Sequence, residues 1–417
     1  MPLEKTNSSA TSLLRNRFIL VNLIASCFMQ IGIWIRNFAI LLFVVSVTDG
    51  DAFAVSLISV AEFLPIFIFS FVGGAFADRW KPRRTMIWCD LLSALSVFLI
   101  LISLIYTTWK VVFFVTFISA TLSQFSQPLS MKLFKKHLSE EQMQKGMSLF
   151  QTIISSFMIF GPILGTFIFE QFGIHVSMAL VGMMFLLSAM TLMFIPKDQN
   201  ISITDQESSV WMDMKIGFKY VWVHQILRTL GFVFMVAGLG LGLIRPLSIF
   251  LITERLHLDK EYLQWLFAVD GAAMIIGGVI VMIFSSKIVP QKIIMVGMAI
   301  MTVGIFMLGS STVFWVTLIT QFIIGLFTPG LLIGINTIIL NNTEENFVGR
   351  VNGILTPLFT GTMVISMSIS GLLKEQFSLF TIYQFSAIFF IIGILVMIPI
   401  MSLRNNKVEV NHSSDVN

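Results

Sequence analysis

The chain has 417 residues, of which 56% are hydrophobic and only 12% are charged, and its mean hydropathy is +0.90. A soluble domain carries about 25% charged residues, so these values exclude a protein whose main solvent is water. The formal net charge is +4. The basic residues lie in short loops between apolar runs, which argues against a nucleic-acid-binding surface.

Apolar runs long enough to cross a bilayer as helices recur along the whole chain. A hydrocarbon core of about 30 Å needs about 20 apolar residues in helical form. The first run is too long for the core of a signal peptide, so we expect it to be a retained span. The sequence predicts an all-α integral membrane protein with twelve transmembrane helices, at residues 18–47, 53–77, 85–107, 111–131, 147–169, 174–195, 229–252, 263–285, 293–310, 312–340, 352–373 and 380–402.

The orientation follows from the distribution of lysine and arginine, which favour cytoplasmic loops. With the N-terminus inside, 20 of the 26 Lys and Arg residues fall in inner segments and four in outer loops. The remaining two, Arg36 and Arg245, lie within spans. We therefore expect a multi-pass protein of the cell membrane with both termini in the cytoplasm.

The two halves of the chain resemble each other. "IRNFAI" at 35–40 matches "IRPLSI" at 244–249, and "SEEQMQKGMSL" at 139–149 matches "TEENFVGRVNG" at 343–353. A third match pairs "GTFIFEQFG" at 165–173 with "SGLLKEQFS" at 370–378. The order of the matches predicts two pseudo-symmetric six-helix bundles. The predicted parts are a cytoplasmic N-terminus (1–17), a first bundle (18–195), a linker (196–228), a second bundle (229–402) and a cytoplasmic tail (403–417).

The linker has a polar first part and a second part in which apolar and charged residues alternate. Trp211, Tyr220 and Leu227 are interspersed with residues such as Lys215 and Lys219. This pattern predicts a helix lying on the inner membrane surface, most simply as a tether between the bundles.

A repeated six-plus-six plan with a long inner loop resembles the major facilitator superfamily of transporters. The stretch "GGAFADRWKPRR" at 73–84 is similar to that family's motif between the second and third spans. Gly74, Asp78 and Arg79 match, with basic Arg83 and Arg84 following, while Lys81 and Pro82 depart from the pattern. The resemblance implies that this loop gates the conformational change without touching substrate, and we expect Asp90 to belong to the same charge cluster.

"FGPILGT" at 160–166 resembles the exporter signature of the same family. Gly161, Pro162 and Gly165 match it, and Thr166 replaces the last glycine. Together with "AEFLP" at 61–65 and "ADRW" at 77–80, it looks like the macrolide-efflux and siderophore-exporter branch. The resemblance implies export of an amphipathic or apolar small molecule by alternating access, by proton antiport.

Two basic and two acidic residues lie deep within predicted spans, where a charge is costly unless it is paired or hydrated. Arg36 and Glu62 lie roughly 16 and 14 Å from the outer ends of the first two spans, and Arg245 and Asp270 each lie roughly 10 Å deep in the seventh and eighth. Either these are structural ion pairs, or the acid loads and releases a proton as access alternates. Glu62 is the leading candidate for proton coupling or substrate binding, and Asp270 is the next.

Other function classes find less support in the sequence. The five histidines are scattered, no metal-ligand spacing exists, and no Gly-x-x-x-x-Gly-Lys-Ser/Thr loop for ATP occurs, so we expect neither an enzyme nor a cofactor. Cys27 and Cys89 both lie in apolar segments, which argues against a disulfide.

Import of a small solute and a transport-fold sensor remain the alternatives. The expected partners are a small-molecule substrate, protons and the lipid bilayer, with no nucleic acid, and we expect a monomer.

Overall fold

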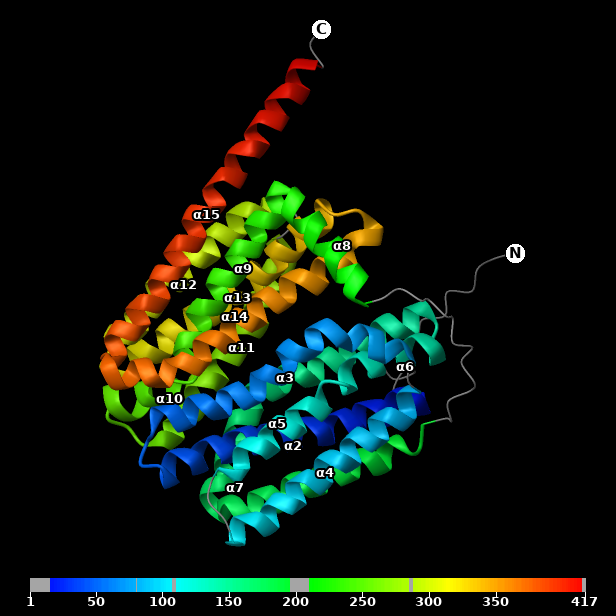
Figure 1. Cartoon of the computed structure of the whole chain (residues 1–417), viewed down its shortest axis with the longest axis vertical. Coiled ribbons are helices and arrows are strands. Elements are labelled where there is room, and N and C mark those ends of the chain that lie inside the picture. Colours follow the sequence, from blue (N-terminus) through cyan, green and yellow to red (C-terminus); the bar gives the residue numbers. More distant parts are fainter. Residues whose placement is uncertain (1–15, 80, 107–109, 196–209, 285–287, 415–417) are drawn as a thin grey trace. The chain divides into compact units, whose positions relative to one another are not determined.

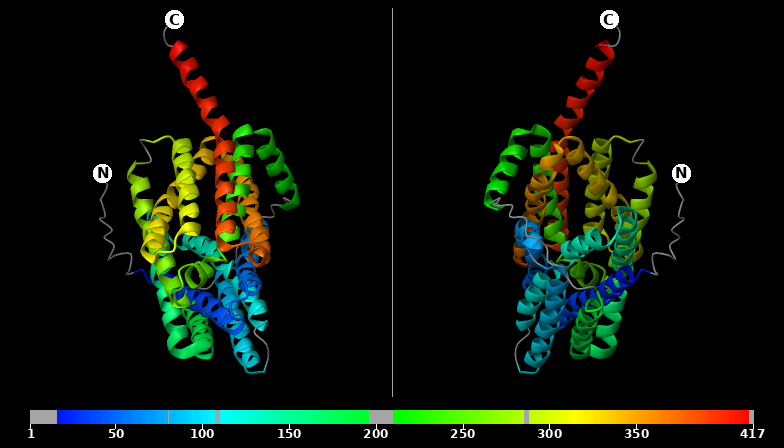
Figure 2. Two further views of the ribbon diagram at one scale, coloured as in Figure 1. Left: turned by 90° about the vertical axis from the view of Figure 1, so that its left-hand side faces the viewer. Right: turned by 90° about the vertical axis from the view of Figure 1, so that its right-hand side faces the viewer.

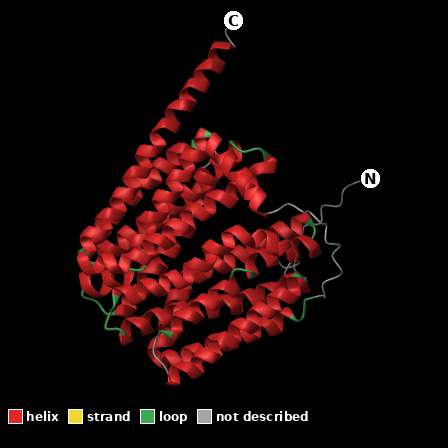
Figure 3. Cartoon of the chain, viewed as in Figure 1, coloured by secondary structure: helices red, strands yellow, loops and turns green. Residues whose placement is uncertain are grey.

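A computed structural model describes residues 16–414, except residues 80, 107–109, 196–209 and 285–287. Within this part of the chain the regular elements are all helices (Figure 3). The predicted all-α class is therefore confirmed. The main helices are α2 (Arg17–Val47), α3 (Ala52–Arg79), α4 (Pro82–Tyr106), α5 (Val111–Ser123), α6 (Ser126–His137), α7 (Glu140–Leu192), α8 (Val210–Val223), α9 (Gln225–Ile244), α11 (Leu263–Phe284), α12 (Pro290–Ser310), α13 (Phe314–Asn341), α14 (Val348–Gln376) and α15 (Leu379–Ser414).

Ten helices in the described part of the chain are long and apolar enough to cross a membrane. One of them, α7, has 53 residues and would be about 80 Å long if straight, more than twice the thickness of a hydrocarbon core. Gly173 interrupts it with φ 71° and ψ 180°, values that only glycine adopts without strain. The two segments of α7 therefore occupy the places of the predicted fifth and sixth spans, 147–169 and 174–195.

The predicted fourth span, 111–131, is divided. It forms α5, which ends at Ser123, and α6, which begins at Ser126 and runs on to His137. The junction residues Gln124 and Phe125 keep right-handed helical backbone angles, so the break is a short turn that hydropathy alone did not reveal. Together, the elements fit a plan of twelve spans.

The predicted seventh span, 229–252, is also not one continuous helix. The α-helix α9 ends at Ile244, and the short α10 (Ser248–Phe250) and a π-helical turn, η1 (Leu251–Arg255), follow it. Pro246 lacks the backbone N–H that a continuous helix would use at this point. Arg245 consequently lies at the end of α9, where the chain turns, and not inside a helix.

By their contacts the described residues form two compact units. One is drawn from Met1–Phe43 and Val72–Gln206, the other from Val44–Phe71 and Glu207–Asn417. The first part of α3 thus groups with the second unit. The bundle boundaries expected from the internal repeat, 18–195 and 229–402, stay a prediction.

In the second unit α9 packs against both α14 and α15, and α13 packs against α11 and α12 (Figures 1 and 2). Glycines allow the closest approaches: a Cβ on Gly242 would collide with the main chain of Met363, and one on Gly277 with that of Leu326. Small residues of this kind let membrane helices pack backbone to backbone. The helix α15 continues through most of the predicted tail to Ser414.

The predicted interfacial helix corresponds to α8, which packs against the start of α14. The Tyr220 ring stacks on Phe347 with 4.3 Å between the ring centres. Gly217 lies against the Arg350 main chain, since a Cβ there would be 2.9 Å from the Arg350 carbonyl oxygen. Phe218 and Trp222 stack on each other and are exposed, as an interfacial helix requires.

Candidate functional site

The buried cation of the first unit is Arg36 on α2, which is 2% exposed. Its Nη1 donates a hydrogen bond to Ser119 Oγ on α5 at 2.6 Å, and its Nε and Nη2 donate to Asn37 Oδ1 at 3.0 and 2.8 Å. These hydrogen bonds orient the guanidinium. Asn37, the next residue on α2, thus supports Arg36.

The exporter-like glycines position α2. A Cβ on Gly165 would lie 2.8 Å from both the Trp34 carbonyl oxygen and Phe38 Cβ, and a Cβ on Gly161 would collide with the Trp34 ring. The two glycines therefore form a notch on α7 into which the Trp34–Phe38 turn of α2 packs. Arg36 lies within this turn, so the notch fixes the helix that carries it.

Thr166 ends the exporter-like sequence, at the position where the family it resembles has a glycine. Its side chain is 2% exposed, and its Oγ1 has no hydrogen-bond partner among the described residues. A buried hydroxyl without a partner costs free energy, about 1–3 kcal/mol by mutational data. We have no structural explanation for this choice of residue.

The second unit holds Asp270 on α11. Gln321 Nε2 on α13 donates a hydrogen bond to Asp270 Oδ1 at 2.9 Å, and Arg245 interacts electrostatically with the same carboxyl. Gly325 on α13 makes this approach possible, because a Cβ there would lie 2.8 Å from both Asp270 Oδ1 and the Asp270 main-chain oxygen. The structure thus brings together Arg245 and Asp270, which the sequence placed at a common depth.

Arg245 also contacts α3. Its guanidinium carbon lies 4.8 Å from the centre of the Phe63 ring, within the range of a cation–π interaction. Phe63 is the neighbour of Glu62, which is partly buried. One exposed cation is therefore shared between an aromatic ring on α3 and a carboxyl on α11.

The part of α3 that carries Glu62 is held against α14. Ser56 Oγ and Ser370 Oγ are hydrogen-bonded at 3.0 Å, and both side chains are buried. Val60 packs in one apolar cluster with Met363, Val364 and Met367. Glu62 and Arg36 belong to different contact units, so the ion pair expected between them stays a prediction.

The expected gating loop is only partly visible. Gly74, Asp78 and Arg79 lie in the last two turns of α3, where the structure describes the backbone alone. Arg83 Nη2 donates a hydrogen bond to the Met193 carbonyl at 2.7 Å, and Arg84 is exposed. This anchors the first turn of α4 to the end of α7.

Asp90 does not join Arg83 and Arg84 as the sequence suggested. It is 4% exposed and its Oδ2 accepts a hydrogen bond from Ser188 Oγ at 2.6 Å. Asp90 lies six residues beyond Arg84, which is about 9 Å along a helix. The carboxyl is therefore deeper in the helix bundle than the basic loop that it was grouped with.

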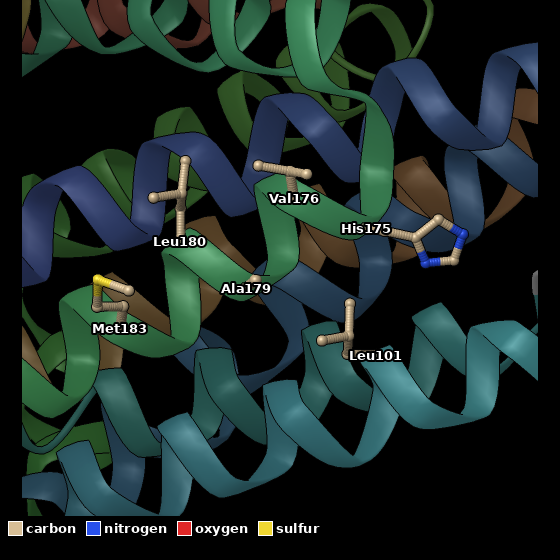
Figure 4. Close-up of a pocket in the computed structure, with 6 residues that line it drawn as sticks. All are labelled: Leu101, His175, Val176, Ala179, Leu180 and Met183. Carbon is tan, nitrogen blue, oxygen red and sulfur yellow. The ribbon is translucent and has the colours of Figure 1, made fainter.

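A cavity of about 640 Å³ opens between α4 and α7, lined by Leu101, His175, Val176, Ala179, Leu180 and Met183 (Figure 4). Its lining is apolar apart from the His175 ring, which points away from the five aliphatic residues in this view. The cavity contains none of the predicted site residues. Among the described residues no group of three or more His, Cys, Asp or Glu side chains could hold a metal ion.

Four residues of these clusters escaped the sequence analysis: Ser119, Ser188, Phe63 and Gln321. Each is the partner of a predicted residue on another helix. Serine and phenylalanine are common within membrane spans and therefore attract no notice. Of the four, only Gln321, an amide in the tenth predicted span, is unusual enough to have been recognised from the sequence.

The family model described as Major Facilitator Superfamily matches residues 23–243 and 230–414. An uncharacterized MFS-type transporter of Bacillus subtilis strain 168, YkuC, is 25% identical over 413 residues, which are 95% of each chain. Multidrug efflux pump Tap of Mycolicibacterium fortuitum is 24% identical over 344 residues, 78% of this chain and 82% of Tap.

Solved transporters share the fold. The nucleoside transporter NupG superposes with a TM-score of 0.76 at 11% identity, over 91% of this chain and 99% of NupG. The POT family transporter PepTSo gives a TM-score of 0.69 at 12% identity, over 94% of this chain and 98% of PepTSo. The chain therefore belongs to the major facilitator superfamily and is a multi-pass membrane transporter, not an enzyme.

Proposed function

We propose that the protein exports an amphipathic or largely apolar small molecule across the cell membrane by proton antiport. The observation that carries this proposal is the cluster of Asp270, Arg245 and Gln321 at the junction of three spans, which Arg245 links to Phe63 on a fourth. Ionisable groups within spans mark ion or substrate pathways by default, because they are costly to keep there.

Proton coupling would depend on Arg245 changing its interaction partner between a carboxylate and the Phe63 ring or the substrate. When Asp270 is ionised, Arg245 neutralises it, and Arg36 would do the same for Glu62 in the pair expected from the sequence. When the acid takes up a proton, the cation is released to the Phe63 ring or to substrate. A displacement of Arg245 would thus link proton binding to helix movement. Glu62 is the leading carrier of the coupling proton, and Asp270 is the second candidate.

The direction and the substrate class rest on similarity. The sequence around the notch, with Gly161, Pro162 and Gly165, resembles the exporter signature, and Tap is named a multidrug efflux pump. The 41 Phe and 25 Met residues of the chain include enough flexible apolar side chains to line a cavity for varied ligands. Import of a small solute is the alternative, and a transport-fold sensor is the alternative from another class.

Uptake into proteoliposomes under an imposed proton gradient tests coupling and direction together, with ethidium as the fluorescent probe. We expect dye to accumulate in the compartment that is the more acidic, and accumulation to stop when an uncoupler collapses the gradient. Accumulation that persists without the gradient would contradict proton antiport. Accumulation only in the alkaline compartment would indicate proton symport, the mode of an importer.

The Glu62→Gln variant tests the leading residue, because the amide matches the shape of the carboxyl. It should express and bind dye yet fail to concentrate it, while dye exchange across the membrane continues. Glu375→Gln, at an exposed glutamate, is the matched control and should transport normally. If Glu62→Gln concentrates dye with unchanged pH dependence, the assignment is wrong and Asp270→Asn is the next variant to measure.

A further inference from the structure

Three helices of the first unit meet at a buried serine. Ser188 on α7 is 1% exposed, and its Oγ lies 2.6 Å from Asp90 Oδ2 on α4 and 3.1 Å from the Ala25 carbonyl oxygen on α2. Asp90 is 4% and Ala25 is 3% exposed. The three groups therefore form a hydrogen-bonded chain that is closed off from solvent and links residues 163 positions apart.

The number of protons in this chain depends on the state of Asp90. A serine hydroxyl has one proton to donate and two lone pairs to accept with. If Asp90 is ionised, both of its oxygens and the Ala25 carbonyl are acceptors, and the single Ser188 proton cannot serve two separate acceptors fully. If Asp90 carries a proton, the carboxyl O–H donates to Ser188 Oγ, and Ser188 donates to Ala25. Only the protonated carboxyl completes both bonds.

No described cation replaces that proton. Asp90 forms neither a hydrogen bond nor an ion pair with the other described titratable groups of its own and the neighbouring helices, and only the adjacent Cys89 thiol interacts with it electrostatically. Arg36 bonds to Ser119 and Asn37, and Arg83 to the Met193 carbonyl. Among the side chains that the structure describes, the remaining titratable groups on these helices are Arg17 and Cys27 on α2, Arg84 on α4, Lys110 before α5, Lys132 on α6, and Lys145, Glu170 and His175 on α7.

A second buried polar side chain lies one turn away. Asn22 on α2 precedes Ala25 by three residues, about 4.5 Å along the helix axis, and is 1% exposed. Neither its Oδ1 nor its Nδ2 has a hydrogen-bond partner among the described residues. The direction from Ala25 to Asn22 leads toward the start of α2, the end that we expect at the cytoplasm. Asn22 thus offers an unused donor and acceptor between Ala25 and that end of α2.

We propose that Asp90 is a second proton-binding site of this transporter, and that its proton closes the chain Asp90–Ser188–Ala25 which ties α4, α7 and α2 together. On proton loss Ser188 turns its hydroxyl to the carboxylate and releases the Ala25 carbonyl. The tie between α7 and α2 is then broken while the tie between α7 and α4 remains. Asp90 belongs to the first unit, so this site is separate from Asp270 and from Glu62 and does not depend on the direction of transport.

Infrared difference spectra of the purified protein in lipid, recorded between acid and alkaline pH, test this directly. A carboxyl that binds a proton gains the C=O stretching band of a carboxylic acid. We expect Asp90→Asn to lose one such band. Ser188→Ala should shift the band of Asp90 without removing it. Glu375→Gln, the control, should lose at most a band typical of a solvated acid. A spectrum of Asp90→Asn identical to that of the parent protein would overturn the proposal.

Thermal unfolding at acid and alkaline pH gives an independent readout. The side-chain amide introduced by Asp90→Asn can donate to Ser188 Oγ at every pH, so this variant should keep the chain closed. Its melting temperature should change less between the two pH values than that of the parent protein. Ser188→Ala should show the same reduced dependence, because no hydroxyl remains to switch. If both variants keep the full pH dependence, Asp90 does not act through Ser188.

These experiments measure proton binding and stability, not transport. If neither Glu62 nor Asp270 couples transport to protons, the infrared and unfolding results expected for the Asp90 variants stay the same. Conversely, an unaltered infrared spectrum in Asp90→Asn would remove this second site while the proposed antiport remained.

Discussion

The Arg245 guanidinium lies over the Phe63 ring at 4.8 Å and also interacts with the Asp270 carboxyl. These contacts join α3, the turn after α9, and α11 through one side chain. Because Arg245 ends its helix at Pro246, its side chain is not confined by a continuing helix and can move between the two partners.

Replacement of Phe63 tests this arrangement. Phe63→Leu keeps an apolar side chain but removes the ring that attracts the cation, an interaction of about 0.5–2 kcal/mol. We expect roughly a 2- to 30-fold change in the transport rate, since about 1.4 kcal/mol corresponds to tenfold. Phe63→Tyr preserves the ring face and should keep most of the rate. Equal rates in both variants would show that the contact has no part in transport.

A larger residue in the notch on α7 should produce a packing defect. In Gly165→Ala the new methyl group would meet the Trp34 carbonyl oxygen at 2.8 Å, and a main-chain atom cannot turn aside. Overpacking of this kind costs about 1–3 kcal/mol. The melting temperature in detergent should therefore fall. Gly278→Ala on α11, where a Cβ meets nothing within 4 Å, is the matched control and should leave the melting temperature unchanged or raise it.

A change in the loop before α4 should slow transport without weakening substrate binding. By its resemblance to the family motif, Asp78 biases the conformational equilibrium and does not touch substrate. Asp78→Asn should therefore lower the transport rate while the dissociation constant for dye stays within about twofold, a difference of roughly 0.4 kcal/mol. Rate and affinity must be measured separately in the same preparation. Normal transport with weakened affinity would contradict the gating role.

The orientation in the membrane can be measured by cysteine labelling. In a chain whose Cys27 and Cys89 are replaced by alanine, Asp205→Cys should not react with an impermeant thiol reagent added outside intact cells. Thr312→Cys, between α12 and α13, should react, because the excess of Lys and Arg places that loop outside. Labelling at position 205 from outside would reverse the predicted topology.

The sequence by itself determined the class of the protein and most of its spans. In a bilayer every buried backbone group must be satisfied within its own helix, so length and hydropathy along a continuous stretch suffice to predict a span. For this reason the first span, 18–47, and the second, 53–77, differ from α2 and α3 by no more than two residues. The break after Ser123 was missed because hydropathy does not report a short turn between two consecutive helices.

The polar partners were decided only by the tertiary structure. Arg36 bonds to a serine 83 positions away, and Asp90 to one 98 positions away. The prediction grouped Asp90 with Arg83 and Arg84 because these are the nearest charged residues along the chain. Which of many serines faces a buried charge depends on the rotation and closeness of two packed helices. Those are set by contacts such as Trp34 against Gly161 and Gly165, and no local pattern along one helix contains them.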